Sequence, residues 1–360
     1  MNKIENIEFK KLKRILPSQF FLMKNCAYKA LLAEAFDKRP LLPVSPNAYL
    51  GTVLHKILEL IAKNEIRSDE EFDAAFNSEV LSVEEMLTRE GHDFFVPLQM
   101  NVRGFGIKKI QLRKHLQSAN RLHGQENSVK YSSEKWLESK DKLIGGRIDL
   151  IIDASDEAEI IDFKTGAITE NCFDDEGESY ITVKEEYQEQ LKLYGYLFFE
   201  NNGRLPAKLT LIDLAKQKFN VAFSYDECVI LSEQAKTLLN DVNNSVDSKQ
   251  FSANPTERNC KFCLYRPACS FYLEGLKQAH SFNDISGEIH NVVRYKNGNV
   301  SVFIGNGIET VTIAGFSHEA FEYFNSNRNK IINVFNLKKE SADFVYSATK
   351  TTKIYESQAT

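Results

Sequence analysis

The stretch Leu143-Ile-Gly-Gly-Arg-Ile-Asp149-Leu-Ile-Ile152 is followed by Ile160-Ile-Asp162-Phe-Lys164-Thr-Gly166 and then by Gln190-Leu-Lys-Leu-Tyr194. The first two runs are apolar except at single charged positions, which predicts two β-strands. Side chains alternate between the faces of a strand, so Asp162 and Lys164 share a face and Asp149 points away from its apolar neighbours. Paired as a hairpin, the two strands can bring Asp149 and Asp162 to one side of a sheet.

These charged side chains predict a site for a divalent metal ion. Two carboxylates favour Mg²⁺ or Mn²⁺, which prefer oxygen ligands and leave positions for water and phosphate. Lys164 beside them can stabilise negative charge on a phosphate or position an attacking water. The alternative is a surface strand with an ion pair between Asp162 and Lys164. Because both stand in an apolar run, where unpaired charges are costly, we interpret the stretch as a metal-dependent phosphodiesterase site.

Three more side chains lie on predicted helices. His55 is part of Gly51-Thr-Val-Leu-His55, in a helix expected from about residue 48. A single histidine there can equally be packed or bound by solvent instead of ligating a metal. Gln190 and Tyr194 are four residues apart, so they share one face of a helix expected over 185–199. Taken alone, that pair could be a polar stripe beside a core helix.

Length and composition bound the class of protein. The chain has 360 residues, 42% of them hydrophobic and 26% charged, so we expect two globular domains. The net charge of −5 excludes a global basic field, and a nucleic-acid binder would need a local basic groove. We find no signal peptide, no apolar run long enough to span a membrane and no Gly-x-x-x-x-Gly-Lys-[Ser/Thr] phosphate loop. These absences predict a cytoplasmic protein whose motor, if one is needed, is a separate helicase or defence-complex subunit.

The rest of the chain divides into a helical and a β-rich part. Residues 66–125 are expected to be charged helices inserted before the sheet, and 166–184 a polar, acidic loop with Asp174, Asp175, Glu176 and Glu178. Short β-prone runs over 285–348, with one helix at 319–325, suit a small closed barrel such as an OB-fold. We expect domains at 1–278 and 279–360, the second stacking bases through residues such as Tyr355 or docking a partner.

One basic stretch is a candidate for contacts to a nucleic-acid backbone. It runs from Arg103 to Lys114, and a solvated helix face explains it equally well. The candidate side chains are Arg103, Lys108, Lys109, Arg113 and Lys114.

Three of the six cysteines form a C-x2-C-x5-C cluster, Cys260-Lys-Phe-Cys263-Leu-Tyr-Arg-Pro-Ala-Cys269. Such spacing is typical of a metal centre, and three thiolates need a fourth ligand. Cys26, Cys172 and Cys228 are the candidates, and spacing cannot choose among them. It also leaves open whether the centre is Zn²⁺ or an iron–sulfur cluster.

Taken in order, these motifs resemble the PD-(D/E)xK superfamily, specifically RecB-type nucleases such as AddB and the CRISPR-associated RecB-like exonucleases. The resemblance covers about residues 17–272. It implies an α/β protein with a restriction-endonuclease-like mixed sheet core and a helical insertion. It also implies that His55, Asp149 and Asp162 bind the metal ion with the carbonyl of Phe163. Lys164 would then be the catalytic lysine, with Gln190 and Tyr194 orienting substrate.

The same resemblance implies a cofactor and an activity. AddB-like nucleases hold a [4Fe-4S] cluster, so Cys26 would join Cys260, Cys263 and Cys269, leaving Zn²⁺ as the less favoured occupant. We expect a Mg²⁺- or Mn²⁺-dependent deoxyribonuclease, an exonuclease on single-stranded DNA or DNA ends, in repair, recombination or phage defence. The alternatives are a catalytically inactive, nuclease-like DNA-binding scaffold and a zinc-binding structural protein.

Overall fold

The computed structural model describes residues 2–4, 6–122, 129–154, 157–173, 177–278, 283–305 and 309–357. Asp174, Asp175 and Glu176 of the expected acidic loop lie outside these ranges, as do the turn residues 155–156 and 306–307. The chain forms two compact units. The central unit comprises Lys11–Lys24 and Ser45–Lys249, and the terminal unit comprises Met1–Lys10, Asn25–Val44 and Gln250–Thr360. The domain boundary expected at 278 stays a prediction.

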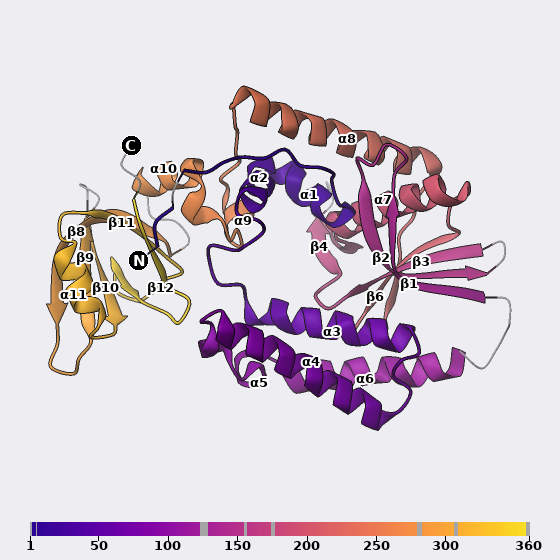
Figure 1. Ribbon diagram of the computed structural model, residues 1–360, viewed down its shortest axis with the longest axis horizontal. Coiled ribbons are helices and arrows are strands. Elements are labelled where there is room, and N and C mark those ends of the chain that lie inside the picture. The colour runs from indigo at the N-terminus through magenta and orange to yellow at the C-terminus, as the bar shows by residue number, and fades with distance from the viewer. Residues whose placement is uncertain are drawn as a thin grey trace. The chain divides into compact units, whose positions relative to one another are not determined.

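A five-stranded mixed sheet organises the central unit (Figure 1), in the order β1-β2-β3-β6-β7. Only β3 and β6 pair in parallel, and the other neighbours are antiparallel. The strands are β1 (Val129–Glu138), β2 (Gly145–Ala154), β3 (Glu157–Lys164), β6 (Lys208–Asp213) and β7 (Lys218–Asn220). Pairing of β2 with β3 begins at Leu150 opposite Ile161, so the two strands separate where Asp149 and Asp162 lie.

Helices of the inserted segment pack against the sheet through an apolar cluster that includes Leu150, Ile161 and Phe163. They are α3 (Pro46–Ala62), α4 (Asp69–Arg89), η1 (Asp93–Phe95), α5 (Leu98–Asn101) and α6 (Phe105–Leu122). Helix α3 begins where Ser45 caps the first turn and Pro46 supplies a preset φ. Its apolar side chains recur at helical spacing and are buried, which fixes the rotation of the helix and thus the direction of His55.

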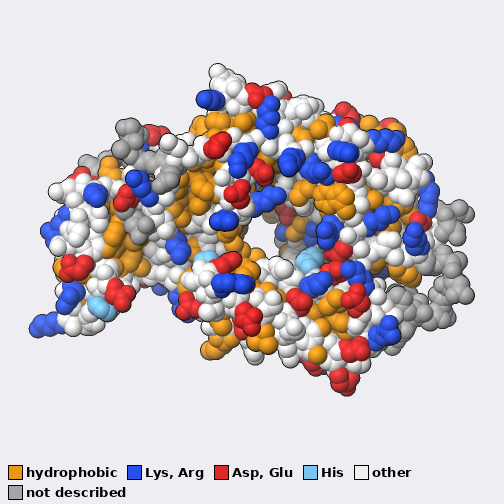
Figure 2. Space-filling view, viewed as in Figure 1, with side chains coloured by type: hydrophobic (Ala, Val, Ile, Leu, Met, Phe, Trp, Pro, Cys, Tyr) orange, Lys and Arg blue, Asp and Glu red, His pale blue; other side chains and the backbone are white. Residues whose placement is uncertain are grey.

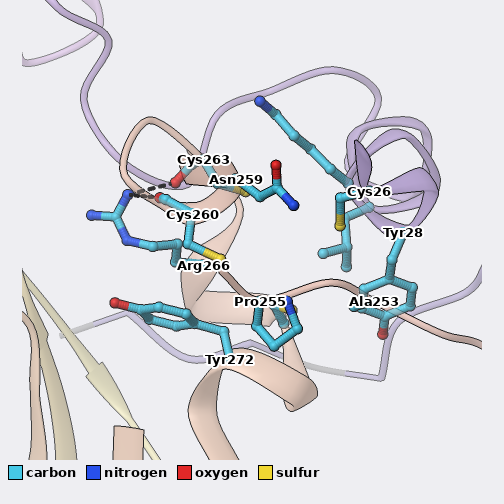
Figure 3. Close-up of a pocket in the computed structure, with 12 residues that line it drawn as sticks. Cys26, Tyr28, Ala253, Pro255, Asn259, Cys260, Cys263, Arg266 and Tyr272 are labelled. Carbon is cyan, nitrogen blue, oxygen red and sulfur yellow. Dashed lines mark hydrogen bonds between the residues drawn. The ribbon is translucent and has the colours of Figure 1, made fainter. Parts of the chain in front are cut away.

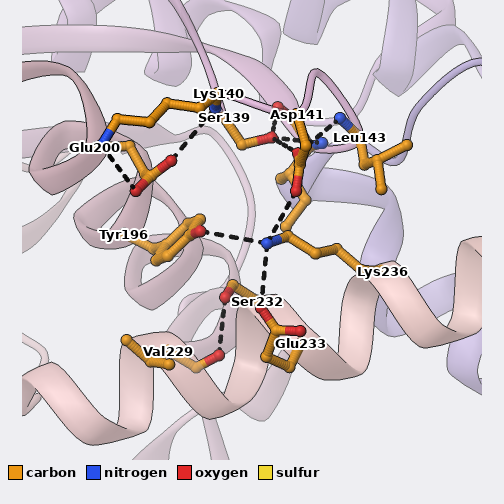
Figure 4. A network of polar contacts seen from close by, with 11 residues as sticks. Ser139, Lys140, Asp141, Leu143, Tyr196, Glu200, Val229, Ser232, Glu233 and Lys236 are labelled. Carbon is orange, nitrogen blue, oxygen red and sulfur yellow. Dashed lines mark hydrogen bonds and ion pairs between the residues drawn. The ribbon is translucent and has the colours of Figure 1, made fainter.

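Helices α7 (Glu185–Asn202) and α8 (Tyr225–Ser248) pack against each other, and α7 lies on the sheet. Helix α7 ends at Gly203, whose φ of 71° suits a glycine C-cap, and a Ser224–Glu227 capping box opens α8. The ammonium of Lys236 on α8 lies 3.0 Å from Asp141 Oδ2, in the β1–β2 turn, and donates to Tyr196 on α7 (Figure 4). This contact fastens both helices to the sheet and fixes the face of α7 that carries Gln190.

The terminal unit is built on a curled seven-stranded sheet in the order β12-β13-β10-β9-β8-β11-β14. Its strands are β8 (Ile285–Arg294), β9 (Val300–Gly305), β10 (Thr310–Phe316), β11 (Ile331–Phe335), β12 (Lys338–Lys339), β13 (Val345–Ser347) and β14 (Lys353–Glu356). Its helices are α2 (Ala27–Ala35), α9 (Glu257–Cys260), η2 (Arg266–Ala268), α10 (Ser270–Gln278) and α11 (Ala320–Ser326). The short β-prone runs expected over 285–348 form strands of this sheet, and the OB-like barrel stays a prediction.

Helix α1 (Pro17–Asn25) ends before Cys26, whose backbone is extended. One local expectation was wrong. The expected loop 166–184 contains an antiparallel hairpin, β4 (Thr169–Phe173) with β5 (Ser179–Val183). The α/β class itself is confirmed, with mixed sheets and helices.

The surface in Figure 2 carries basic and acidic side chains side by side over most of the face in view, in keeping with the small net charge. In the described ranges, no helix is long and apolar enough to cross a membrane.

Candidate functional site

Asp162, Lys164 and Gln190 form a closed polar triangle between β3 and α7. Lys164 Nζ lies 2.7 Å from Asp162 Oδ2 and donates to Gln190 Oε1 at 2.9 Å. Gln190 Nε2 donates in turn to Asp162 Oδ1 at 2.9 Å. Asp162 and Gln190 are only 3% and 6% exposed, so each side chain is held by the other two. The sequence placed these residues on a strand and a helix face, and the structure brings all three together.

Asp149 lies beside this triangle, where β2 separates from β3. Its Oδ2 accepts a hydrogen bond from the backbone N–H of Phe163 at 2.8 Å and lies 3.9 Å from His55 Nδ1. Burial and the neighbouring Asp162 carboxylate raise the pKa of Asp149 to about 8. Burial lowers the pKa of His55, which keeps its imidazole neutral, as a metal ligand must be.

Tyr194 and Tyr187 on α7 differ in their contacts. The hydroxyl of Tyr194 donates to the backbone carbonyl of Arg147 at 2.9 Å, and burial raises its pKa well above the usual value. Tyr194 therefore fastens α7 to β2, whereas a substrate-orienting role stays a prediction. Tyr187, which the sequence did not suggest, lies with its ring 4.5 Å from Lys164 Nζ. That cation–π contact gives the lysine ammonium a further partner besides Asp162 and Gln190.

Glu134 on β1 also lies at the site, although no motif in the sequence indicates it. It stands between the Ser133–Leu150 and Lys135–Ile148 pairs, and hence opposite Asp149. Its φ of 52° is a left-handed conformation that is uncommon outside glycine. Its negative charge adds to those that raise the pKa of Asp149. The sequence shows only that Glu134 is a charged residue within a predicted strand. It does not show that its side chain lies near Asp149.

The donor set fits a divalent metal ion. Asp162 Oδ2 is buried, and within the described ranges no donor makes a hydrogen bond to it, because Lys164 approaches at ion-pair distance but in poor hydrogen-bond geometry. Such an orphaned carboxylate oxygen is expected where a cation binds. His55, Asp149, Asp162 and the carbonyl of Phe163 would hold it. In the described part of the chain, no three His, Cys, Asp or Glu side chains are already grouped to hold one metal ion.

This crowding of charge predicts a pH effect on stability. Between the unfolded pKa of about 4 and the folded value of about 8, the folded protein binds a proton on Asp149 that the unfolded chain has lost. In chelator, unfolding free energy should therefore fall as pH rises through this range. In Asp149→Asn, which can still accept from Phe163, the melting temperature should depend less on pH. Melting curves from pH 5 to 8.5 test this, with the exposed Asp247→Asn as control, and equal slopes for wild type and Asp149→Asn would contradict it.

The cysteines predicted to bind a cofactor lie together in the terminal unit. Cys26, at the start of α2, lines one pocket with Cys260, Cys263 and Cys269. Figure 3 shows the sulfurs of Cys26 and Cys260 directed toward the space between the two segments. The other two candidates for a fourth ligand lie in the central unit, Cys172 on β4 and Cys228 buried on α8.

Burial favours the protonated thiols of Cys260, Cys263 and Cys269. Burial raises the pKa of Cys260 to about 11 and that of Cys269 to about 12, and it also raises the pKa of Cys263. A metal or cluster would displace those protons, since thiolates are the ligands. Arg266 supports the loop by donating to the carbonyls of Cys260 and Cys263 at 3.1 and 2.8 Å. The four cysteines therefore line one pocket, and the group that they bind stays a prediction.

Two side chains of the basic stretch pair with acidic residues of the protein. Lys109 lies 2.8 Å from Asp73 Oδ1, and Arg113 also pairs with Asp73, so both join α6 to α4. Lys109 also contacts the ring of Phe76, and Arg113 contacts the ring of Phe72, both on α4. These two side chains tie the inserted helices to each other, and a role of the stretch in DNA contact stays a prediction.

The comparison with protein families agrees with this site. The model of the PD-(D/E)XK nuclease superfamily matches residues 14–270. A crystal structure named as a candidate exonuclease from Eubacterium rectale is 7% identical, with a TM-score of 0.44, covering 73% of this chain and 88% of that one. The crystal structure of a protein named SSO0001 is 17% identical, with a TM-score of 0.25, covering 62% and 95%. Among curated proteins, none matches the sequence. On the family match, which spans the site from His55 to Tyr194, the chain belongs to the PD-(D/E)XK nuclease superfamily.

Proposed function

We propose that this protein is a metal-dependent deoxyribonuclease of the RecB-type, AddB-like group, an exonuclease on single-stranded DNA or DNA ends. The observation that carries the proposal is the buried triangle of Asp162, Lys164 and Gln190 with Asp149 beside it. Superfamily membership supports hydrolysis of a nucleic acid. Mg²⁺ or Mn²⁺ is the proposed ion, because the candidate ligands are oxygens and one imidazole.

The side chains divide the work of phosphodiester hydrolysis between them. Asp149, Asp162, His55 and the carbonyl of Phe163 would hold the ion, which when bound would polarise the phosphate and lower the pKa of water. Lys164 stands where its ammonium can offset charge that develops on a phosphate oxygen. Gln190 bridges the lysine and Asp162, so it fixes the direction of both. A preset arrangement of this kind reduces the reorganisation that the reaction needs.

The role in the cell belongs to the same proposal. DNA repair, recombination or phage defence would supply single strands or ends, and a separate helicase or defence-complex subunit in the cytoplasm would unwind the duplex. A catalytically inactive DNA-binding scaffold is disfavoured, because each charged residue of the site is present and mutually bonded.

The test of the nuclease proposal is a cleavage assay. Purified protein is incubated with 5′- and 3′-labelled single- and double-stranded DNA in Mn²⁺, in Mg²⁺ and in chelator. We expect loss of label from single strands or ends with either metal and none in chelator. RNA of the same sequence serves as the competing substrate. Absence of DNA cleavage with both metals, in protein that binds Mn²⁺, overturns the proposal.

We also propose a [4Fe-4S] cluster held by Cys26, Cys260, Cys263 and Cys269. The shared pocket supports this set. A zinc ion would need all four sulfurs about 2.3 Å from one point, whereas a cluster accepts thiolates that are farther apart. The cluster would join residue 26 to residue 260, closing a very long loop, so its main effect would be on stability.

Cys26→Ala distinguishes the proposed ligand from the other cysteines. We expect this variant to lose the visible absorbance and most of the iron and sulfide of protein purified without oxygen. Cys172→Ala, which removes a cysteine in the central unit, is the matched control and should keep both. Metal analysis that finds one zinc per chain in the wild type, with no sulfide, contradicts the cluster.

A further inference from the structure

The outer strands beside the candidate site carry an aromatic and basic surface that the metal chemistry does not use. Trp136 on β1 is 43% exposed and pairs directly with Arg147 on β2. Arg147, whose side chain is 62% exposed, is two residues before Asp149 along β2. Alternate residues of a strand share a face and lie about 7 Å apart, so the surface continues outward from Asp149. Arg14 completes it, with its guanidinium 5.3 Å from the centre of the Trp136 ring.

The indole ring of Trp136 is held in place from several sides. A Cβ atom at Gly145 would lie 2.9 Å from the ring, so the ring lies over the backbone at a position where only glycine fits. Its N–H donates to the carboxylate of Glu138, which also pairs with Arg14 at 2.7 Å. A large aromatic side chain that is both exposed and preset in direction offers a stacking platform, because ordering it on binding costs little conformational entropy.

We propose that Arg14, Trp136 and Arg147 form a binding track for single-stranded DNA that leads to the candidate site. A base would stack on Trp136, and Arg147 would contact the backbone phosphate between that base and the site. Stacking on an aromatic ring joined to basic side chains is how proteins hold single strands without reading sequence. In duplex DNA the bases are already stacked and paired, so the track favours single strands. This inference rests on the proposed nuclease function.

The existing partners of the two arginines do not prevent this role. Arg147 Nε lies 3.7 Å from Glu134 Oε2, and Arg14 pairs with Glu138, whose side chain is 34% exposed. Ion pairs at such exposure contribute little, so a phosphate can replace the carboxylate at small cost. Both arginines can therefore bind phosphates of a single strand whose base stacks on Trp136.

The single tryptophan of the chain makes the test direct, since all indole fluorescence reports on Trp136. The full-length protein is titrated with a single-stranded oligonucleotide in chelator, where no cleavage occurs. We expect saturable quenching, and little change with a duplex of equal length. In parallel, anisotropy of a labelled oligonucleotide should show about tenfold weaker binding for Trp136→Ala and a smaller loss for Trp136→Phe.

Two more variants distinguish DNA binding by the track from a general effect of substitution on DNA affinity. Arg147→Gln should lower the slope of log affinity against log salt by about 0.7, the value for one phosphate contact on a single strand. Tyr225→Ala removes an aromatic of similar exposure, 46%, on α8 and should bind as the wild type does. Binding without quenching, or equal affinities for Trp136→Ala and Tyr225→Ala, overturns the track. Quenching without cleavage in Mn²⁺ instead leaves the track standing and overturns the nuclease proposal.

Discussion

Lys164→Ala is expected to lower the rate of DNA cleavage by about 10²–10³-fold. The ammonium of Lys164 lies 2.7 Å from Asp162 and donates to Gln190, so it is fixed where charge would develop on the phosphate. Alanine removes the ion pair with Asp162 and the hydrogen bond to Gln190. Because this contact would matter most in the transition state, the loss should fall on kcat, with little change in the affinity for a single-stranded oligonucleotide.

The control for this variant is a second ion-paired lysine in the same unit. Lys192 on α7 pairs with Glu227 at 2.6 Å and its side chain is about as shielded as that of Lys164. Lys192→Ala should cleave DNA at the wild-type rate. Single-turnover cleavage in Mn²⁺ compares the two variants after their melting curves have been matched. A Lys164→Ala protein that still degrades single-stranded DNA at the wild-type rate would falsify the proposed role.

Asp284→Ala is expected to reduce the stability of the terminal unit by about 3–5 kcal/mol, the usual effect of removing one partner from a buried ion pair. The side chains of Arg266 and Asp284 are 4% and 0% exposed, and Nε donates to Oδ2 at 2.8 Å. Tyr272 donates to the same oxygen, and the backbone N–H of Asn336 donates to Oδ1. Alanine leaves these three donors facing a cavity.

The prediction is checked by urea unfolding, with near-ultraviolet and far-ultraviolet signals followed together. A pair at the surface of the same unit supplies the control, since Lys10 and Asp37 lie 3.7 Å apart with side chains 54% and 74% exposed. Asp37→Ala should leave the midpoint near that of wild type. If Asp284→Ala and Asp37→Ala unfold at the same urea concentration, the ion pair does not stabilise the unit as the structure indicates.

Local patterns were enough to predict the elements that carry the candidate site. Helix α7 was expected over 185–199 and spans Glu185–Asn202, and the strand expected at Ile160–Lys164 is β3, which spans Glu157–Lys164. Apolar periodicity is strong in both, since each buries a face against the core. The position of Asp162 on β3 and of Gln190 on α7 followed from that periodicity. Their contact depends on the packing of the helix on the sheet, and only the resemblance suggested it.

Interactions between distant or weakly patterned residues could not be predicted in this way. The β4–β5 hairpin alternates poorly and carries exposed apolar side chains at Phe173 and Ile181, so its sequence looks like a loop. Glu134 contributes to the site through a left-handed backbone that no spacing signals. The pair of Arg266 and Asp284 is buried by elements that lie far apart in the chain, and each residue alone resembles a surface charge.

The order of segments in the terminal unit has a consequence for synthesis on the ribosome. The whole central unit has been made once residue 249 is added, whereas the terminal unit still lacks Gln250–Thr360. Until then Tyr28 on α2 lacks the rings of Phe251 and Phe271 that pack on it. Met1–Lys10 and Asn25–Val44 therefore emerge long before the rest of their unit. Since exposed apolar segments of unfinished chains associate readily, α2 is the segment that a nascent-chain chaperone would have to shield.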